Sequence, residues 1–270
     1  MNMDHQYKNM KYLLSEHKHS YGNNIHLLSS PYILSLLADL GHPMTGGSKA
    51  IRLVQKLYSF LLDNFLSHGV EWKQEKVETR MTMQHPSQFY VGPLLPKETS
   101  FVVADIARAG IIPSLQIYQE LADYFHPECI RQDHLYLARE KKGDEVSINC
   151  SGSKIGGDKN NRIVIIPDPM GATGETIKYC LDHYEKHVPG KVKKFVALHL
   201  MVTPEYIKEV QKLKIPFDVY ALRIDRGASD ESVTKLSLGE KLDKEFGLDD
   251  NKYIVPGAGG VGEVLNNSWV

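Results

Sequence analysis

Cysteine is scarce in this sequence of 270 residues. The three cysteines, Cys129, Cys150 and Cys180, are odd in number and widely spaced, which fits neither a disulfide framework nor the paired-cysteine spacing of a zinc site. Long apolar runs are also lacking, since no stretch of about 18 apolar residues occurs and residues 1–20 have no signal-peptide core. We therefore expect a reduced, cytoplasmic protein.

An excess of either charge is lacking as well. The 32 basic and 33 acidic residues leave a formal net charge of −1, so no overall field steers the chain toward nucleic acid or an anionic membrane. We expect neither as a partner, and cations gathered locally must bind any polyanionic ligand. The length and the hydrophobic content of 42% fit one large domain, residues 26–270, after an N-terminal appendage, residues 1–25.

The pattern of apolar residues from residue 101 onward predicts an α/β fold. Short β-branched runs alternate with amphipathic stretches, which is typical of a central parallel sheet flanked by helices. The expected strands are 101–106, 134–139, 162–168, 194–201 and 218–225, and the expected helices are 112–125, 174–188 and 203–213. Ligands of such sheets bind at the C-terminal ends of the strands, so the loops after residues 106, 139, 168 and 225 form the candidate site.

Two helices and an extended arm are expected before this sheet. One short helix has Pro31 in its first turn and Gly41 just past its end. Residues 49–66 carry apolar side chains at helical spacing, which predicts a stripe that faces the core. Residues 69–83 alternate loosely between apolar and polar, which indicates an arm or hairpin that either pairs with a partner subunit or packs on its own core.

The loop after the third expected strand, residues 168–176 with the sequence DPMGATGET, has the composition of a phosphate site. Its two glycines permit a turn whose backbone amides bind an anion, the next helix adds its positive end, and Thr173 and Thr176 offer hydroxyls. Asp168 can accept hydrogen bonds from hydroxyls such as a ribose diol. Alternatively, Asp168 and Thr173 only cap the helix.

Two arginines stand at the ends of the two preceding expected strands. Arg108 lies in ARAGI and Arg139 in HLYLARE. At the same edge of the sheet as Asp168, they would bring positive charge and bidentate donors to a second phosphate group.

Two other patterns look like cofactor sites but lack essential parts. The stretch 253–264, YIVPGAGGVGEV, matches the dinucleotide fingerprint, but the eight residues after Gly262 cannot supply a further helix, strand and acid. Cys180, His183 and His187 share one helix face, but no fourth ligand is evident nearby. We expect no metal held by protein side chains alone.

In these motifs the sequence resembles uracil phosphoribosyltransferases. DPMGATGET looks like the phosphoribosyl-diphosphate loop of that family, and ARAGI is similar to its Leu-Arg-Ala-Gly-Leu. HLYLARE is similar to its His-Ile-Gly-Leu-Tyr-Arg-Asp, and YIVPGAGG to its Tyr-Ile-Val-Pro-Gly-Leu-Gly-Asp. The motifs occur in the family's order over residues 26–262. The resemblance implies a type I phosphoribosyltransferase fold, with a small hood from N- and C-terminal segments over the base.

The resemblance also implies an activity, which is transfer of ribose 5-phosphate from phosphoribosyl diphosphate to uracil, with Mg²⁺ assistance, in pyrimidine salvage. UMP and diphosphate would be the products, a homodimer or larger homo-oligomer would be the active form, and GTP binding is a further expectation. Arg108, Arg139 and Asp168 would be catalytic. The phosphoribosyl diphosphate site would comprise Arg108, Arg139, Asp168, Pro169, Met170, Gly171, Ala172, Thr173, Gly174, Glu175, Thr176 and Gly260. The nucleobase site would comprise Tyr253, Ile254, Gly259, Gly260 and Val261.

Several departures from the family pattern bear on the substrate. Gly260 stands where the family has an aspartate that contacts the phosphoribosyl donor, and Glu263 is a nearby acid that can replace it in part. Gly171 and Glu175 replace a leucine and a glycine of the phosphate loop. Residues 226–252 form a longer segment that we interpret as a solvated surface insertion. Three hypotheses stay open, which are a uracil enzyme, an enzyme for another nucleobase, and a catalytically weak homologue that senses phosphoribosyl diphosphate or a nucleotide.

Overall fold

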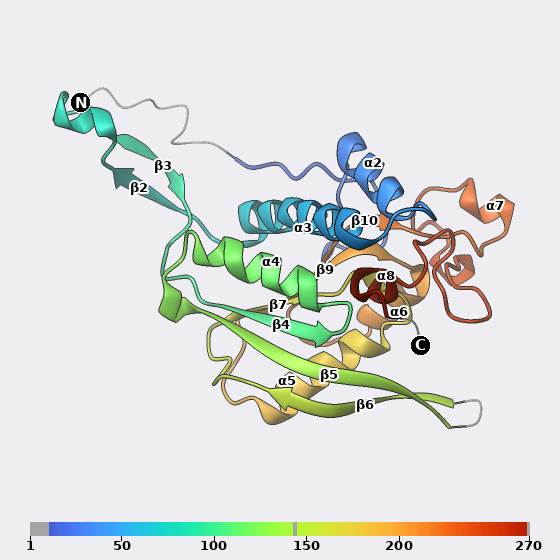
Figure 1. Cartoon of the computed structure of the whole chain (residues 1–270). Helices are drawn as coiled ribbons and strands as arrows, with labels where there is room; N and C mark the ends of the chain where they lie inside the picture. The colour runs from blue at the N-terminus through green and yellow to red at the C-terminus, as the bar shows by residue number, and fades with distance from the viewer. Residues whose placement is uncertain (1–10, 143–144, 269–270) are drawn as a thin grey trace.

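The computed structural model describes residues 11–142 and 145–268, without the side chains of residues 138–147. Its centre is an eight-stranded sheet in the order β1-β10-β9-β7-β4-β5-β6, with β8 beside β9 (Figure 1). The strands are β1 (Ile25–Leu27), β4 (Phe101–Ala107), β5 (Ile130–Lys142), β6 (Glu145–Lys154), β7 (Ile163–Pro167), β8 (Met170–Gly171), β9 (Lys194–Val202) and β10 (Phe217–Ile224). All pairs are parallel except β5 with β6. The predicted parallel sheet is confirmed.

Helices cover both faces of the sheet. The longer helices are α2 (Pro31–Leu40), α3 (Gly47–Gly69), α4 (Ile111–Ala122), α5 (Glu175–His187) and α6 (Pro204–Val210), and the short ones are α7 (Glu231–Thr234), α8 (Val261–Asn266), η1 (Arg80–Met83), η2 (Pro127–Cys129) and η3 (Leu242–Lys244). Side chains of β7 alternate between the faces, because Ile163 and Ile165 join the cluster under α2, α3 and α4 while Val164 joins the cluster under α5 and α6. The predicted α/β layering is confirmed.

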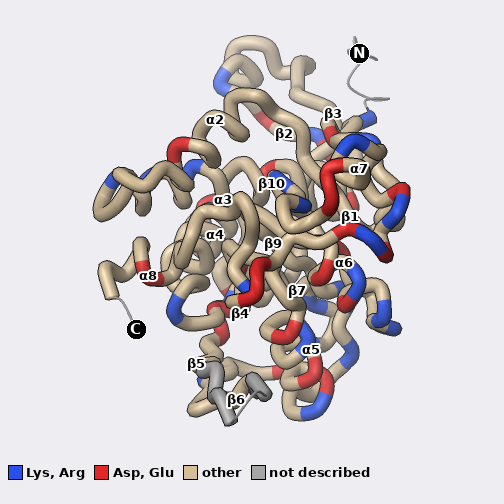
Figure 2. The backbone as a smooth tube through the Cα atoms, turned by 90° about the vertical axis from the view of Figure 1, so that its right-hand side faces the viewer, with Lys and Arg blue, Asp and Glu red and all other residues tan. Residues whose placement is uncertain are grey.

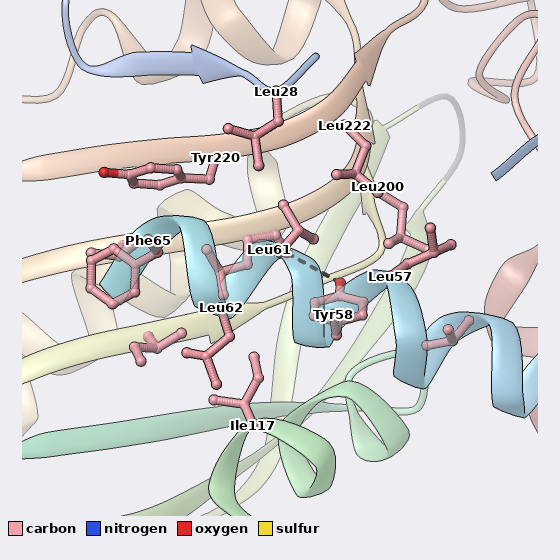
Figure 3. Packing of buried hydrophobic residues seen from close by; sticks show 14 of the residues in the cluster. Leu28, Leu57, Tyr58, Leu61, Leu62, Phe65, Ile117, Leu200, Tyr220 and Leu222 are labelled. Atoms are coloured by element: carbon pink, nitrogen blue, oxygen red, sulfur yellow. Dashed lines mark hydrogen bonds between the residues drawn. The ribbon is translucent and has the colours of Figure 1, made fainter. Parts of the chain in front are cut away.

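The helix α3 supplies the centre of one core. Leu57, Tyr58, Leu61 and Phe65 are all fully buried (Figure 3). They recur at helical spacing, so they form one stripe against the sheet. The hydroxyl of Tyr58 donates a hydrogen bond to the carbonyl oxygen of Leu198 at 3.1 Å, which satisfies the one polar atom of this stripe. The predicted core-facing stripe is confirmed.

A hairpin projects from the body at the end of α3. Strand β2 (Lys73–Val77) pairs antiparallel with β3 (Tyr90–Leu94) in a separate two-stranded sheet (Figure 1). Every residue of β2 is exposed. The predicted arm is therefore a hairpin, and β2 does not pack on its own core.

The second expected strand ends later than predicted. Strand β5 runs through Arg139 to Lys142 and pairs with β6, so Arg139 lies inside a long hairpin, opposite Ile148. The prediction that Arg139 ends its strand was wrong, because the polar residues after it continue the antiparallel pairing with β6 rather than form a loop. Its side chain is outside the described residues.

The segment 226–252 is anchored to the body. The carboxylate of Glu245 is fully buried and accepts hydrogen bonds from Arg226 Nη1 at 2.8 Å and from the hydroxyl of Tyr21 at 2.6 Å. The interpretation as a solvated insertion was therefore wrong around Glu245, where a buried ion pair holds the segment. Residues 1–10 lie outside the described part, and the domain boundary at residue 25 stays a prediction.

Positive and negative residues are mixed in the view of Figure 2. Figure 2 shows Lys and Arg positions interspersed with Asp and Glu positions on most elements, in line with the net charge of −1. Among the described residues, no helix combines the length and the apolar character that crossing a bilayer requires.

Candidate functional site

A cleft of about 200 Å³ lies at the C-terminal edge of the sheet. The loop after β4 contributes Arg108, the loop after β7 contributes Asp168, and the first turn of α5 contributes Thr176. Its other lining residues are Ile106, Ala107, Ala109, Leu137, Ile148 and Met170. The structure therefore brings Arg108 together with Asp168 and Thr176. Asp168 and Thr176 belong to one motif, whereas Arg108 lies far from them in the sequence.

Residues 168–176 form a turn with its own internal order. The amide of Asp168 donates to the carbonyl of Leu198 at 3.2 Å, and one carboxylate oxygen of Asp168 accepts from the amide of Met170 at 3.3 Å. Gly174 is the N-cap of α5 with a φ of 83°, a left-handed conformation that favours glycine. The hydroxyl of Thr173 accepts a hydrogen bond from the amide of Glu175, the first residue of α5, at 3.4 Å. Thr173 therefore takes part in capping α5, in line with the capping alternative, while Asp168 bonds within its own loop at Met170.

The loop also rests on β9 and α6. The hydroxyl of Thr203 donates to the carbonyl of Ala172 at 2.6 Å, and its amide donates to the carbonyl of Gly171 at 3.0 Å. A Cβ atom on Gly171 would lie 2.9 Å from Val202 Cγ1 and 3.1 Å from Tyr206 Cδ2. A larger side chain here would push against Val202 and Tyr206, so glycine fits this position where the family has leucine.

A residue that sequence reasoning missed, His199, supports the same loop. It is fully buried on β9, with Nδ1 at 2.5 Å from the carbonyl oxygen of Asp168 and Nε2 at 2.7 Å from the hydroxyl of Tyr206. Burial lowers the pKa of His199 to about 4, so the ring is neutral near pH 7. Because a carbonyl only accepts, Nδ1 carries the proton and Nε2 accepts from Tyr206. The sequence signal that could have identified His199 is its position as a polar residue inside the apolar strand 194–201.

Arg108 connects the cleft to the C-terminal tail. It follows a cis peptide bond after Ala107. Its Nη1 donates to the carbonyl oxygen of Ser268 at 3.1 Å and to the hydroxyl at 3.0 Å, and its Nη2 lies 3.9 Å from a carboxylate oxygen of Glu263. The guanidinium is held at the mouth of the cleft by residues that follow the predicted base-binding motif.

The predicted nucleobase residues lie in this tail. The side chains of Ile254 and Val261 are buried in the core, whereas Tyr253 is exposed. Gly259 has a φ of 66° and open space around it. The buried side chains of Ile254 and Val261, one on each side of Gly259, hold the backbone around Gly259 in place.

Two residues at the end of β10, Arg223 and Asp225, hold the tail and were missed from the sequence. Arg223 Nη2 donates to the carbonyl of Gly257 at 3.1 Å, and the amide of Gly257 donates to Asp225 Oδ2 at 2.8 Å. A Cβ atom on Gly41 would lie 3.5 Å from the Cβ atom of Ala258. The tail therefore meets the segment after α2, as expected for a hood of N- and C-terminal segments.

The metal-like pattern on α5 does not form a cluster. Cys180 is fully buried and burial raises its pKa, while the rings of His183 and His187 lie 4.9 Å apart. Within residues 11–142 and 145–268, no group of three or more His, Cys, Asp or Glu side chains has a geometry that could hold a metal ion.

The sequence matches a known protein family over most of its length. The model of the family uracil phosphoribosyltransferase matches residues 27–247. The uracil phosphoribosyltransferase of Thermococcus kodakarensis is 23% identical over 81% of this chain and 88% of its own length, and that of Pyrococcus furiosus is 25% identical over 81% and 87%. The solved structure of the AQ2163 protein from Aquifex aeolicus has the same fold, with a TM-score of 0.67 and 21% identity over 89% of this chain and 97% of that chain. The tail from Tyr253 lies beyond the match to the family model.

Proposed function

Because the chain belongs to the uracil phosphoribosyltransferase family and is a phosphoribosyltransferase, we propose that its acceptor base is uracil. The reaction would transfer ribose 5-phosphate from phosphoribosyl diphosphate to uracil, giving UMP and diphosphate. The observation that carries this proposal is that Asp168, Met170 and Thr176 of the 168–176 turn line one cleft together with Arg108 at the C-terminal edge of the sheet.

The 168–176 turn is assigned to the ribose 5-phosphate. The hydroxyls of Thr173 and Thr176 and the backbone amides of the turn would donate to the phosphate oxygens. The carboxylate of Asp168 would accept hydrogen bonds from the ribose hydroxyls, which is supported by its place on the wall of the cleft.

Arg108 is assigned to the diphosphate, and Arg139 to the same group from the β5–β6 hairpin. Cleavage at the anomeric carbon gives the ribose oxocarbenium character and puts negative charge on the leaving diphosphate. Arginines that bind this charge more tightly in the transition state accelerate the step without a side-chain nucleophile. Mg²⁺ that enters with the donor would be held by phosphate oxygens and the carboxylate of Asp168, the oxygen ligands that it prefers, and it neutralises part of the diphosphate charge.

The tail is assigned to the base. Backbone groups near Ile254 and Gly259 can pair with the polar edge of a pyrimidine, and the glycine permits close approach. The buried side chains of Ile254 and Val261 support this role, because they fix the backbone that would read the base.

A panel of free nucleobases tests the proposal. The protein is incubated with phosphoribosyl diphosphate, Mg²⁺ and each base in turn, and release of diphosphate is measured. We expect release with uracil. Release only with another base would overturn the assignment of uracil and keep the class of reaction. No release with any base, together with a rise in Tm on addition of phosphoribosyl diphosphate, would instead favour a sensor.

The assembly proposed for this enzyme is a homodimer formed through the β2–β3 arm. The arm exposes Trp72, Val77, Met81, Met83 and Tyr90, and an isolated two-stranded hairpin is only marginally stable in water. A second copy of the chain that covers the arm would remove this apolar surface from water. The cytoplasmic location and GTP binding stay predictions.

A further inference from the structure

The first turn of α8 places a carboxylate over Gly260. A Cβ atom built on Gly260 would lie 2.1 Å from Oε2 of Glu263 and 2.8 Å from its Cδ. Cβ atoms essentially never make contacts this short, so the Glu263 side chain would have to move if residue 260 carried a side chain. The carboxylate of Glu263 therefore occupies the space into which a side chain at position 260 would extend.

This carboxylate lies at the border of the cleft. Its Oε1 is 3.9 Å from Nη2 of Arg108, and a Cβ atom on Gly262 would be 3.3 Å from the Cβ atom of Ala109. Arg108 and Ala109 both line the cleft. The start of α8 therefore packs directly on the loop that carries the proposed diphosphate-binding arginine.

The oxygen atoms of the Glu263 carboxylate remain able to accept hydrogen bonds from a ligand. A distance of 3.9 Å to Arg108 is too long for a hydrogen bond, and the interactions found among the described residues include no hydrogen bond to the Glu263 carboxylate. Only 25% of the side chain is exposed, so water solvates the charge incompletely. A partly buried carboxylate of this kind is stabilised by a ligand that brings hydroxyl donors.

We propose that Glu263 is a substrate-binding residue whose carboxylate accepts hydrogen bonds from the hydroxyls of the phosphoribosyl group. The proposal rests on the proposed function and deepens it, because it names the acid that faces the donor from the tail. Position 260 is glycine and cannot supply one, and Glu263 reaches back over it from three residues later. The departure at Gly260 is then a relocation of the carboxylate rather than its loss.

A neutral isostere gives the first test. Glu263→Gln keeps the shape of the side chain and removes its charge, so we expect KM for phosphoribosyl diphosphate to rise roughly 10-fold, the loss expected for one charge-assisted hydrogen bond. KM for the base and the Tm without ligand are expected to stay near the wild-type values. Glu128→Gln is the matched control, because Glu128 is 74% exposed on its side chain and lies outside the cleft. An unchanged KM for the donor in Glu263→Gln overturns the proposal.

The second test moves the carboxylate from position 263 to position 260. Gly260→Asp alone introduces a Cβ atom into the space of the Glu263 carboxylate and is expected to impair donor binding. The double variant Gly260→Asp/Glu263→Ala puts one carboxylate back in that space, so we expect it to bind the donor more tightly than Glu263→Ala. A folded double variant that binds no better than Glu263→Ala overturns the relocation.

The rise in Tm caused by phosphoribosyl diphosphate serves as a readout that does not depend on turnover. If the wild type transfers to no base, the proposed function fails, and a smaller donor-induced rise in Glu263→Gln still supports the role of Glu263. If the donor raises the Tm of wild type and Glu263→Gln equally, the inference fails while the proposed function stands. A donor that raises the Tm of neither protein overturns both.

Discussion

The carbonyl oxygen of Asp168 accepts a hydrogen bond from Nδ1 of His199 at 2.5 Å, across the neighbouring ends of β7 and β9. The other ring nitrogen accepts from the hydroxyl of Tyr206 at 2.7 Å. These two hydrogen bonds connect the backbone of Asp168, which we propose binds phosphoribosyl diphosphate, to Tyr206 on α6. They require a neutral imidazole with its proton on Nδ1. The orientation of Asp168 is therefore coupled to the protonation of a buried histidine.

We expect the stability of the protein to fall on acidification because of His199. Burial lowers the pKa of His199 to about 4 in the folded state, against about 6.5 in the unfolded chain. The unfolded state then binds more protons between these values, so stability is full above pH 6.5 and is lost as pH falls toward 4. The loss at pH 5 is about 2 kcal/mol, measured as the free energy of unfolding in urea at pH 7 and pH 5.

The variant His199→Gln isolates this contribution. It removes the titrating ring, so its free energy of unfolding is expected to change less between pH 7 and pH 5 than that of the wild type. The NMR signal of the His199 ring gives a second measurement that needs no variant, since it is expected not to shift between pH 7 and pH 5.5. A ring that titrates near pH 6.5 would contradict the prediction.

Asp168→Asn is expected to weaken binding of phosphoribosyl diphosphate at least 10-fold, the scale of one lost charge-assisted hydrogen bond. Asparagine keeps an oxygen that can accept from the amide of Met170, so the turn is expected to keep its shape. Isothermal titration calorimetry measures the affinity. The control is Asp182→Asn on the exposed side of α5, where the carboxylate only pairs loosely with Lys186. Wild-type affinity in Asp168→Asn would remove Asp168 from the site.

Gly171→Leu, which introduces the family's residue, is expected to destabilise this protein by about 1–3 kcal/mol, the usual cost of overpacking. The reason is that Val202 and Tyr206 already fill the space beside Gly171. Thermal and urea unfolding measure the change. Gly152→Ala is the matched control, since the nearest atom to a Cβ there is 3.9 Å away. A Gly171→Leu protein as stable as the wild type would show that β9 and α6 yield easily at this point.

Local patterns were sufficient for much of the fold. The stripe of α3 was predictable because helical spacing alone selects Leu57, Leu61 and Phe65, and the strands β4, β7, β9 and β10 were predictable from continuous β-branched runs. Strand β6 was missed because the EVSINCSGSK stretch is polar and partly exposed, so its pairing with β5 depends on the partner strand.

Only the part of the candidate site that lies within one sequence motif could be predicted from the sequence. The 168–176 turn is contiguous in sequence, so its glycines and threonines predict a phosphate-binding turn without knowledge of the fold. The support of Asp168 by His199, the anchoring of Gly257 by Arg223 and the placement of Glu263 over Gly260 all join residues distant in sequence or depend on the path of a short helix. Such contacts arise from tertiary packing, which no local spacing encodes.

The last prediction concerns the arm. Every residue of β2 is exposed. Val77 at the end of β2 and Met83 in η1, between β2 and β3, present apolar surface. We expect the protein to be a dimer and the double variant Val77→Lys/Met83→Lys to raise the dimer dissociation constant at least 10-fold, because two buried charges replace apolar contacts. Sedimentation equilibrium over a range of concentrations measures this constant.

A control separates loss of the arm contact from a general effect of added charge. Met44→Lys introduces the same charge at a side chain that is 87% exposed and lies outside the arm, so it is expected to leave the dissociation constant unchanged. The Tm of all three proteins at high dilution shows whether the monomer itself is intact. A wild type that is monomeric at every concentration, or a double variant that associates as the wild type does, would show that a second copy does not cover the arm.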